Sequence, residues 1–181
     1  MSELRTNRIV PRDGLTSGTF NGGGIIQVKQ AVQTQPQSAT AGDFHGSGGN
    51  NFSAMADIPG LSVAITPSRS DSKILISYHL YIGGHNSVTY IRLLRDSTGL
   101  AIPSGMTNGS TGVNFTTTPN NGFMSTNSFQ FLDSPATTNS VTYKLQWAGN
   151  SSTYTLYLNR YPGSSTSYIG SSSITVMEVT G

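Results

Sequence analysis

Three histidines are the residues of this sequence best suited to act as acid–base groups. A serine nucleophile needs a histidine base and a third group that orients the base, so the 26 serines alone define no active site. His45 and His85 lie in glycine-rich stretches, and His79 occupies a polar position of a strand-like run. The Gly-x-Ser-x-Gly motif of many hydrolases does not occur in the chain. We therefore expect loop and surface histidines and predict that the protein is not an enzyme.

The acidic residues give no clearer sign of a catalytic or metal site. A pair of carboxylates in a cleft would suit glycoside hydrolysis, but the eight acidic residues are scattered. Aspartates in turns commonly bond to their own backbone, and three fall in predicted turns: Asp71, Asp96 and Asp133. His79 and His85 flank another predicted turn and could approach each other, but no third metal ligand is close in sequence. The sequence predicts no metal and no cofactor.

Aromatic side chains are the remaining candidates for a binding site. Tyrosine and tryptophan rings can stack on sugars or pack against a partner chain. Most of the aromatic residues occupy positions in predicted strands where they would fill a core or an interface. We expect Tyr157 and Tyr161 to be the most exposed of them, and they are our candidates for contact with a glycan or a partner.

The composition predicts an all-β protein. Ser, Thr, Gly and Asn account for 82 of the 181 residues, and only 10% of the residues are charged, against about 25% in an ordinary domain. Strong helix formers are scarce, which disfavours a helical bundle, and the recurring apolar runs disfavour a disordered chain. No apolar run approaches the roughly 20 residues of a membrane span, so we predict no membrane insertion. The chain has no cysteine, which excludes disulfides and thiolate metal sites.

Nine strand-like runs, spaced ten to twenty residues apart, predict an antiparallel β-sandwich that is jelly-roll-like. They are Ile25–Val32, Leu61–Thr66, Lys73–Ile82, Val88–Arg95, Leu100–Pro103, Ser128–Leu132, Val141–Ala148, Thr153–Asn159 and Ser173–Val179. The proline in Leu100–Pro103 suits a short edge strand. Two polar stretches, residues 33–53 and 104–122, are expected to be loops.

The alternation within these runs predicts which face of each strand is buried. Apolar and polar residues alternate in most runs, which is typical of antiparallel sheets with one solvated face. In Lys73–Ile82 the apolar face carries Ile74, Ile76, Tyr78, Leu80 and Ile82. In the last run Glu178 falls on the same face as Ile174 and Val176.

The first forty residues carry the whole excess of positive charge. They hold four basic and two acidic residues, while the remaining chain is balanced, so the net charge of +2 lies at the N-terminal end. This charge is too small for a nucleic-acid footprint. We predict that residues 1–24 form an extended attachment arm with a glycine-rich hinge and that residues 25–181 form the β-sandwich. The arm residues expected to contact a partner, partly by strand addition, are Leu4, Arg5, Asn7, Arg8, Ile9, Val10 and Arg12.

Five stretches resemble a family of small virion proteins of tailed phages, notably cyanophages and other marine phages. The stretches are Leu4–Gly14, Gly24–Val28, Leu93–Thr98, Phe131–Thr138 and Ser173–Val179. The resemblance implies a jelly-roll-like domain that forms a homotrimer and attaches through its N-terminal segment. It also implies a place in the virion, after synthesis in the cytoplasm of the host bacterium.

Two functions fit this resemblance. The first is a capsid decoration or cement protein that binds the major capsid protein or another virion protein and stabilises the head. The second is a short tail-fibre or receptor-binding protein that recognises a host surface glycan. The chain contains no long coiled coil or β-helix to serve as a fibre shaft, which favours the first function. The polar loops predicted at residues 33–53 and 104–122 are compatible with the second function, glycan recognition.

Overall fold

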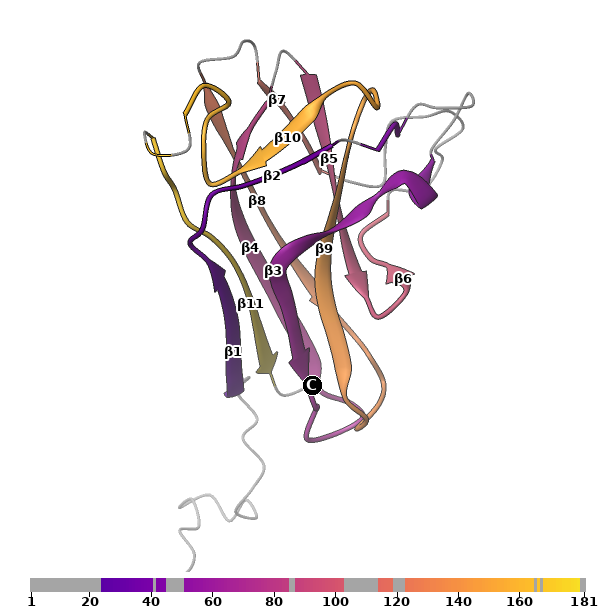
Figure 1. Cartoon of the computed structure of the whole chain (residues 1–181). Coiled ribbons are helices and arrows are strands. Elements are labelled where there is room, and N and C mark those ends of the chain that lie inside the picture. Colours follow the sequence, from indigo (N-terminus) through magenta and orange to yellow (C-terminus); the bar gives the residue numbers. More distant parts are fainter. Residues whose placement is uncertain are drawn as a thin grey trace, which may run out of the picture.

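The computed structural model of this chain contains two antiparallel β-sheets that pack face to face (Figure 1). It describes residues 24–40, 42–44, 51–84, 87–102, 114–118, 123–164, 166 and 168–179. The predicted antiparallel, jelly-roll-like β-sandwich is confirmed. The division between an arm and a domain at residue 24 stays a prediction, because residues 1–23 lie outside the described residues.

The six strands of sheet A are β1 (Ile25–Gln33), β2 (Gln37–Thr40), β4 (Lys73–Gly83), β8 (Met124–Asp133), β10 (Thr155–Leu158) and β11 (Ser172–Val179). The five strands of sheet B are β3 (Ala56–Ile65), β5 (Ser87–Arg95), β6 (Thr98–Gly99), β7 (Asn114–Thr118) and β9 (Val141–Gly149). A short 3-10 helix, Phe52–Ala54, precedes β3. Among the described residues, no helix is long and apolar enough to cross a lipid bilayer.

The inner faces of the two sheets form the main hydrophobic core. The apolar face predicted for β4 is buried, as are the inward residues of β9 and β11. These side chains alternate with exposed or half-buried neighbours, as expected for sheets with one face in the core. Burying apolar surface at roughly 25 cal/mol per Å² is the main force that holds the sheets together.

Three predictions about the chain between the strands are wrong. The described part of the predicted edge strand Leu100–Pro103, Leu100–Ile102, forms no strand, and Pro103 lies outside the described residues. The strand at this edge is instead β6, which begins two residues earlier because Asp96 adopts a left-handed conformation (φ 52°) and turns the chain back onto β5. The stretches 33–53 and 104–122 are not entirely loop, since they contain β2 and β7. Both of these short strands consist mainly of Ser, Thr, Gln and Asn, so no apolar alternation marks them.

A second, smaller apolar cluster lies on the other face of sheet B. Phe44, in a stretch expected to be a polar loop, is fully buried and stacks on Tyr90 with ring centroids 4.5 Å apart. Its backbone N–H donates to the carbonyl of Gly149 at 3.0 Å, which fastens this segment to β9. Phe52 packs edge-on against Phe44 at 5.6 Å, and the guanidinium of Arg92 lies 4.4 Å above the Phe52 ring. The connection from β2 to β3 therefore covers sheet B.

Sheet A contains two interrupted strands that lie side by side. On one edge, β1 and β2 are separated by three residues that include Pro36. Next to them, β10 and β11 both pair with β4, and the chain between them leaves the sheet as a loop, residues 159–171. Such interruptions leave backbone donors and acceptors that must find other partners.

Asn159 supplies these partners. It is fully buried and left-handed (φ 59°), and its amide donates to the carbonyl of Gln33, at the end of β1, at 2.6 Å. Its side-chain oxygen accepts from the Ser172 hydroxyl at 2.6 Å, and that hydroxyl accepts from the backbone N–H of Tyr81 at 3.0 Å. The Asn159 backbone N–H donates to the Tyr81 carbonyl, while Gly170 N–H donates to the Asn159 carbonyl and closes the loop. One side chain thus joins β1, β4 and β11.

We expect Asn159→Ala to lower the free energy of unfolding by about 2–4 kcal/mol. The substitution leaves a buried carbonyl and a buried hydroxyl without their partner and places Ala in a left-handed conformation. Asn139→Ala, at an exposed position, is the matched control and should change stability by less than about 0.5 kcal/mol. Urea unfolding followed by the fluorescence of Trp147, the single tryptophan, measures both. Equal stability of the two variants would contradict this role for Asn159.

Candidate functional site: the outer face of sheet A

His79 lies on the outer face of sheet A, as its polar position in the sequence predicted. Its Nδ1 atom is 2.6 Å from the Ser128 hydroxyl on β8, and the Tyr81 ring packs edge-on against it at 4.9 Å. A shallow depression surrounds the pair, lined by β4 and β8. Within the described part of the chain, no carboxylate pairs with His79 to orient it as the base of a catalytic triad. The contact therefore fixes two side chains on an open sheet surface.

The structure leaves part of the histidine prediction untested. His45 and His85 lie outside the described residues, so the predicted approach of His79 and His85 stays a prediction. In the residues that are described, no three His, Asp or Glu side chains come together as metal ligands would.

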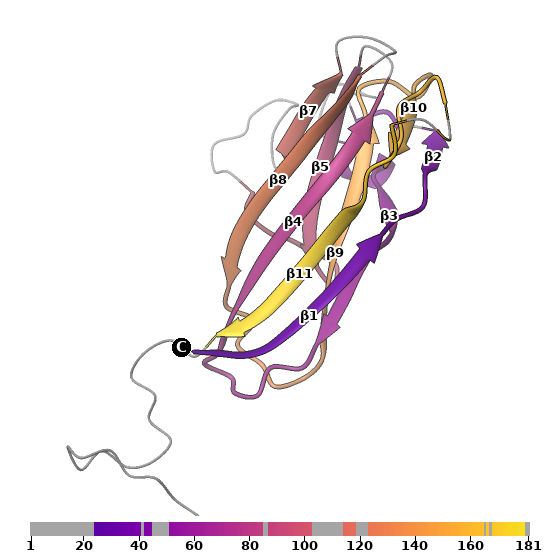
Figure 2. The same ribbon diagram turned by 90° about the vertical axis from the view of Figure 1, so that its left-hand side faces the viewer.

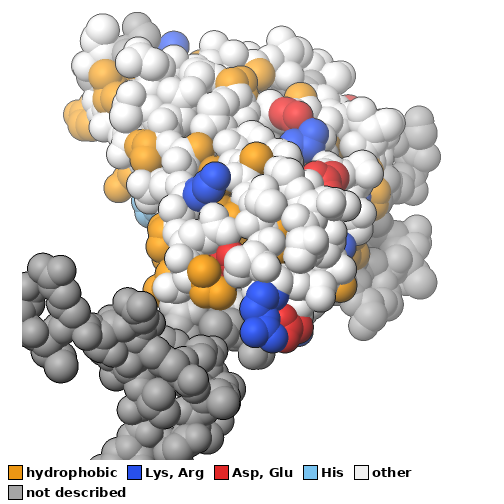
Figure 3. Space-filling model, turned by 90° about the horizontal axis from the view of Figure 1, so that it is seen from below, with side chains coloured by type: hydrophobic (Ala, Val, Ile, Leu, Met, Phe, Trp, Pro, Cys, Tyr) orange, Lys and Arg blue, Asp and Glu red, His pale blue; other side chains and the backbone are white. Residues whose placement is uncertain are grey.

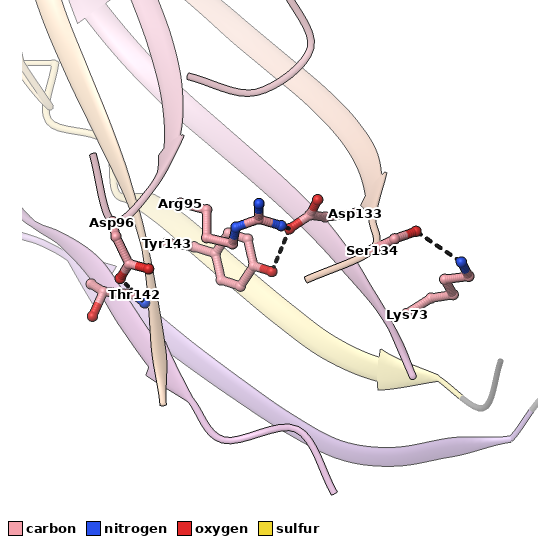
Figure 4. A network of polar contacts seen from close by, with 7 residues as sticks. All are labelled: Lys73, Arg95, Asp96, Asp133, Ser134, Thr142 and Tyr143. Carbon is pink, nitrogen blue, oxygen red and sulfur yellow. Dashed lines mark hydrogen bonds and ion pairs between the residues drawn. The ribbon is translucent and has the colours of Figure 1, made fainter. Parts of the chain in front are cut away.

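The prediction that Asp133 lies in a turn is wrong: it is the acidic member of a partly buried ion pair between the sheets. It ends β8, and its Oδ2 atom is 2.7 Å from Arg95 Nη1 on β5 (Figure 4). The Tyr143 hydroxyl donates to the same oxygen at 2.7 Å. Burial raises the pKa of Tyr143, and the neighbouring Asp133 raises it further, so the hydroxyl stays protonated as a donor. Two stretches of the phage resemblance, Leu93–Thr98 and Phe131–Thr138, meet at this ion pair.

The other two aspartates lie in turns, as predicted, and Asp71 accepts a hydrogen bond from its own backbone. Asp96 accepts from the backbone N–H of Thr142 at 2.9 Å and so fastens the end of β5 to β9 (Figure 4). Asp71 forms an exposed, two-pronged ion pair with Arg69 at 2.8 and 2.7 Å. The Arg69 guanidinium lowers the pKa of Asp71. These contacts shape turns and hold no ligand.

Glu178 is a buried carboxylate at the end of the sandwich where β1 begins. The side chain has no solvent exposure, as its place on the apolar face of β11 predicted. It accepts from the Ser68 backbone N–H at 2.7 Å, from the Ser68 hydroxyl at 2.6 Å and from the Gln27 amide at 2.6 Å. Burial alone would raise the pKa of Glu178, but these hydrogen bonds outweigh it and hold the pKa at about 2. The carboxylate therefore joins β1 to β11 and to the turn after β3.

A row of apolar side chains crosses the outer face of sheet A. Strand pairing places Val28 opposite Met177, Met177 opposite Leu75, and Leu75 opposite Leu132, so the row crosses four neighbouring strands. Its two ends are the most exposed, with Val28 at 54% and Leu132 at 53%. Figure 2 shows the same four strands, β1, β11, β4 and β8, side by side in front. Contiguous apolar surface is a feature of many interaction sites, so this row is a candidate for one.

Three other exposed apolar residues lie on the edge strand β1, where the apolar row ends at Val28. They are Ile25, Ile26 and Val32, all on β1. No second strand among the described residues pairs with the free side of β1, whose nine residues include no proline and one lysine. Such an unprotected edge is a template for pairing with another chain.

The loop of residues 159–171 presents tyrosines at the opposite end of sheet A. Tyr157 and Tyr161 are only half-buried, and Arg160 lies 4.9 Å above the Tyr157 ring. The prediction that these two are the most exposed of the aromatic residues is therefore wrong, because Tyr168 is 77% exposed. The ring of Tyr168 meets Tyr161 edge-on at 5.5 Å. Beside it lies a shallow groove lined by Tyr81, Met124, Tyr168, Ile169, Gly170 and Ser171. The prediction that Tyr157 and Tyr161 contact a glycan or a partner stays a prediction.

The predicted arm contacts lie outside the described residues. These are Leu4, Arg5, Asn7, Arg8, Ile9, Val10 and Arg12. The structure does place the start of the predicted domain, since Ile25 pairs with Val179 at the end of sheet A. Both ends of the described chain therefore meet at one end of the sandwich (Figure 2).

Comparison with known proteins gives a distant structural likeness only. No protein-family model matches the chain, and no curated protein matches it. The VP2 subviral particle of infectious bursal disease virus matches with 11% identity and a TM-score of 0.40, over 98% of this chain and 42% of that one. T=1 particles derived from infectious bursal virus match with 12% identity and a TM-score of 0.43, over 98% of this chain and 41% of that one. This chain thus spans about two fifths of their length, and so low a similarity carries no argument about function.

We expect acid to destabilise the protein through Glu178. Because its pKa falls from 4.5 to about 2 on folding, the carboxylate stabilises the fold fully above about pH 5 and loses this effect as the pH falls toward 2. The expected loss is roughly 3 kcal/mol. Glu178→Gln should be less stable than the wild type at pH 7, and the difference should shrink toward pH 2.

Urea unfolding between pH 2 and pH 7 measures this effect. The matched control is Asp71→Asn, which removes an exposed carboxylate and should keep most of the wild-type pH dependence. An unchanged pH dependence in Glu178→Gln would show that other groups cause the acid sensitivity.

Proposed function

We propose that this chain is a structural protein of a phage virion, most specifically a capsid decoration or cement protein. In this proposal it forms a homotrimer, binds the major capsid protein or another virion protein through its N-terminal arm, and stabilises the head. It performs no catalysis and needs no cofactor. The protein is made in the cytoplasm of the host bacterium and then joins the particle.

The observation that carries this proposal is the position at which the arm joins the sandwich. Residues 1–23 precede β1, an edge strand that pairs with β11 on one side only among the described residues and carries exposed Ile25, Ile26 and Val28. This end of the molecule is therefore suited to attachment by strand addition. The loop with Tyr168 lies at the other end of sheet A, so one end is left to face solvent. Such a polarity suits a module held on the surface of a larger particle.

The resemblance to small phage virion proteins supports the same conclusion from the sequence. Two of its stretches contain Arg95 and Asp133, the ion pair that joins sheet B to sheet A. A third stretch, Ser173–Val179, contains Glu178, which fastens β1. The residues that carry the resemblance are thus among those that hold this sandwich together.

Deletion of residues 2–20 should abolish attachment without unfolding the domain. The deletion removes the basic and apolar side chains of the arm but none of the described contacts of the sandwich. Co-sedimentation with phage particles that lack the chain measures attachment, and a thermal melt shows that the domain is folded. We expect at least a tenfold loss of binding, which corresponds to about 1.4 kcal/mol.

Tyr168→Ala serves as the control for this experiment. It alters the most exposed tyrosine at the far end of sheet A and should bind particles as the wild type does. A folded deletion variant that still sediments with the particles would overturn the proposed role of the arm.

A second function, recognition of a host surface glycan by a short tail fibre, is favoured by the tyrosines of the loop. The exposed Tyr168 and the half-buried Tyr161 form an edge-to-face pair beside a shallow groove. Asn159 fixes the base of the loop, so the rings are held in place before any ligand binds. Aromatic faces of this kind can stack on sugar rings.

Affinity electrophoresis in host polysaccharide tests this second function. The wild type should be retarded, and Tyr168→Ala should bind about three- to tenfold more weakly, as expected for the loss of one aromatic contact. Ile102→Ala, at an exposed apolar position elsewhere, is the matched control and should behave as the wild type. If host polysaccharide does not retard the wild type, the glycan-binding function is wrong.

A further inference from the structure

The outer face of sheet A combines apolar character with an absence of formal charge. Above the apolar row lies a polar row, and above that a third row that contains His79. None of the twelve side chains in these rows is Asp, Glu, Lys or Arg. The rows are Val28, Met177, Leu75 and Leu132; Gln30, Thr175, Ser77 and Gln130; and Val32, Ser173, His79 and Ser128. The centres of stable interfaces are depleted of charge in the same way.

The nearest charged groups to these rows lie at the margin. Lys73 is on β4 below the apolar row, and its ammonium group donates to the Ser134 hydroxyl at 2.8 Å (Figure 4). Figure 3, a view from the end of the sandwich, shows hydrophobic side chains gathered on the left, the side to which sheet A faces, with charged side chains mostly elsewhere. A partner on this face would therefore remove few charges from water.

We propose that other copies of this chain cover the outer face of sheet A, which becomes the inner surface of the homotrimer. This inference rests on the proposed function and names the surface that its trimer uses. An uncharged face offers no attraction to a strongly charged partner, whereas a second copy presents the same uncharged face with the same apolar row. In the assembly, Val28 and Leu132 at the two ends of each row lie against neighbouring copies.

The area of this face requires the three contacts of a trimer to form together. Four strands spaced about 4.8 Å apart, over roughly eight residues of about 3.3 Å each, cover on the order of 500 Å² in each protomer. Three copies together bury on the order of 1,500 Å², or about 500 Å² at each of the three pairwise contacts, which is less than an ordinary specific interface between two partners.

The same arrangement places the arms correctly for attachment. Three flat sheets around an axis form a prism, with the apolar rows at one level inside it. Because Ile25 and Val179 lie together at one end of sheet A, three arms would leave the prism at the same end. The three Tyr168 loops would lie at the opposite end, free of the particle.

Lysine substitutions at the ends of the apolar row test this surface. Val28→Lys and Leu132→Lys each add three ammonium groups to the inside of the prism, but the exposed side chains tolerate the change in the isolated protomer. Ile102→Lys is the matched control, since Ile102 is similarly exposed at 45% but lies outside the face. Light scattering coupled to size-exclusion chromatography should give three times 19.1 kDa for the wild type and the control, and 19.1 kDa for the two variants.

The outcomes separate this inference from the proposed function. A wild-type trimer that persists in both variants would overturn the surface but leave the trimer intact. A wild-type dimer that both variants dissociate would support the surface and overturn the number of copies. A wild type that is monomeric at micromolar concentration overturns both the contact between copies and the trimer. If the two lysine variants then also fail to bind particles, the occupant of this face is another virion protein. Thermal melts show that each variant is folded.

Discussion

The buried side chain of Asn159 determines how sheet A is built. The edge strand of this sheet is interrupted between β1 and β2, and its neighbour is interrupted between β10 and β11. Each interruption leaves backbone donors and acceptors without strand partners. Asn159 satisfies the carbonyl at the end of β1 and contacts Ser172, which in turn holds β4. The left-handed backbone at this residue turns the chain out of the sheet, and the Gly170 bond returns it. The fold thereby gains a rigid loop at one end without losing the sheet.

Two other polar contacts lie away from Asn159: one holds the start of β1, and the other joins sheet A to sheet B. Glu178 holds the start of β1 in the sheet through Gln27, and Arg95 joins the two sheets through Asp133. Neither contact has the exposure or the neighbours of a catalytic site. These polar groups position edges and loops, and the sheet face between the start of β1 and the tyrosine loop carries three rows of uncharged side chains. This geometry supports the proposed role as a module for assembly.

The sequence predicted the features that depend on local alternation. The buried faces of β4, β9 and β11 follow from period-two patterns, and so does the burial of Glu178. Features that depend on pairing between distant segments could not be predicted. The strands β2 and β7 are polar and exist because β10 and β5 pair with them, and Phe44 is buried because its segment crosses sheet B. The apolar row on sheet A also escapes sequence analysis, because it depends on the register of four strands.

The central claim is that sheet A faces other copies of the chain while the start of β1 faces the particle. Cryo-electron microscopy of virions that contain the protein tests this claim most directly, since it gives the orientation of every sandwich. The account predicts three sandwiches around an axis, with the four strands of the apolar row inside and Ile25 nearest the capsid surface. Sandwiches with sheet A facing solvent, or with the Tyr168 loop nearest the capsid, would contradict it.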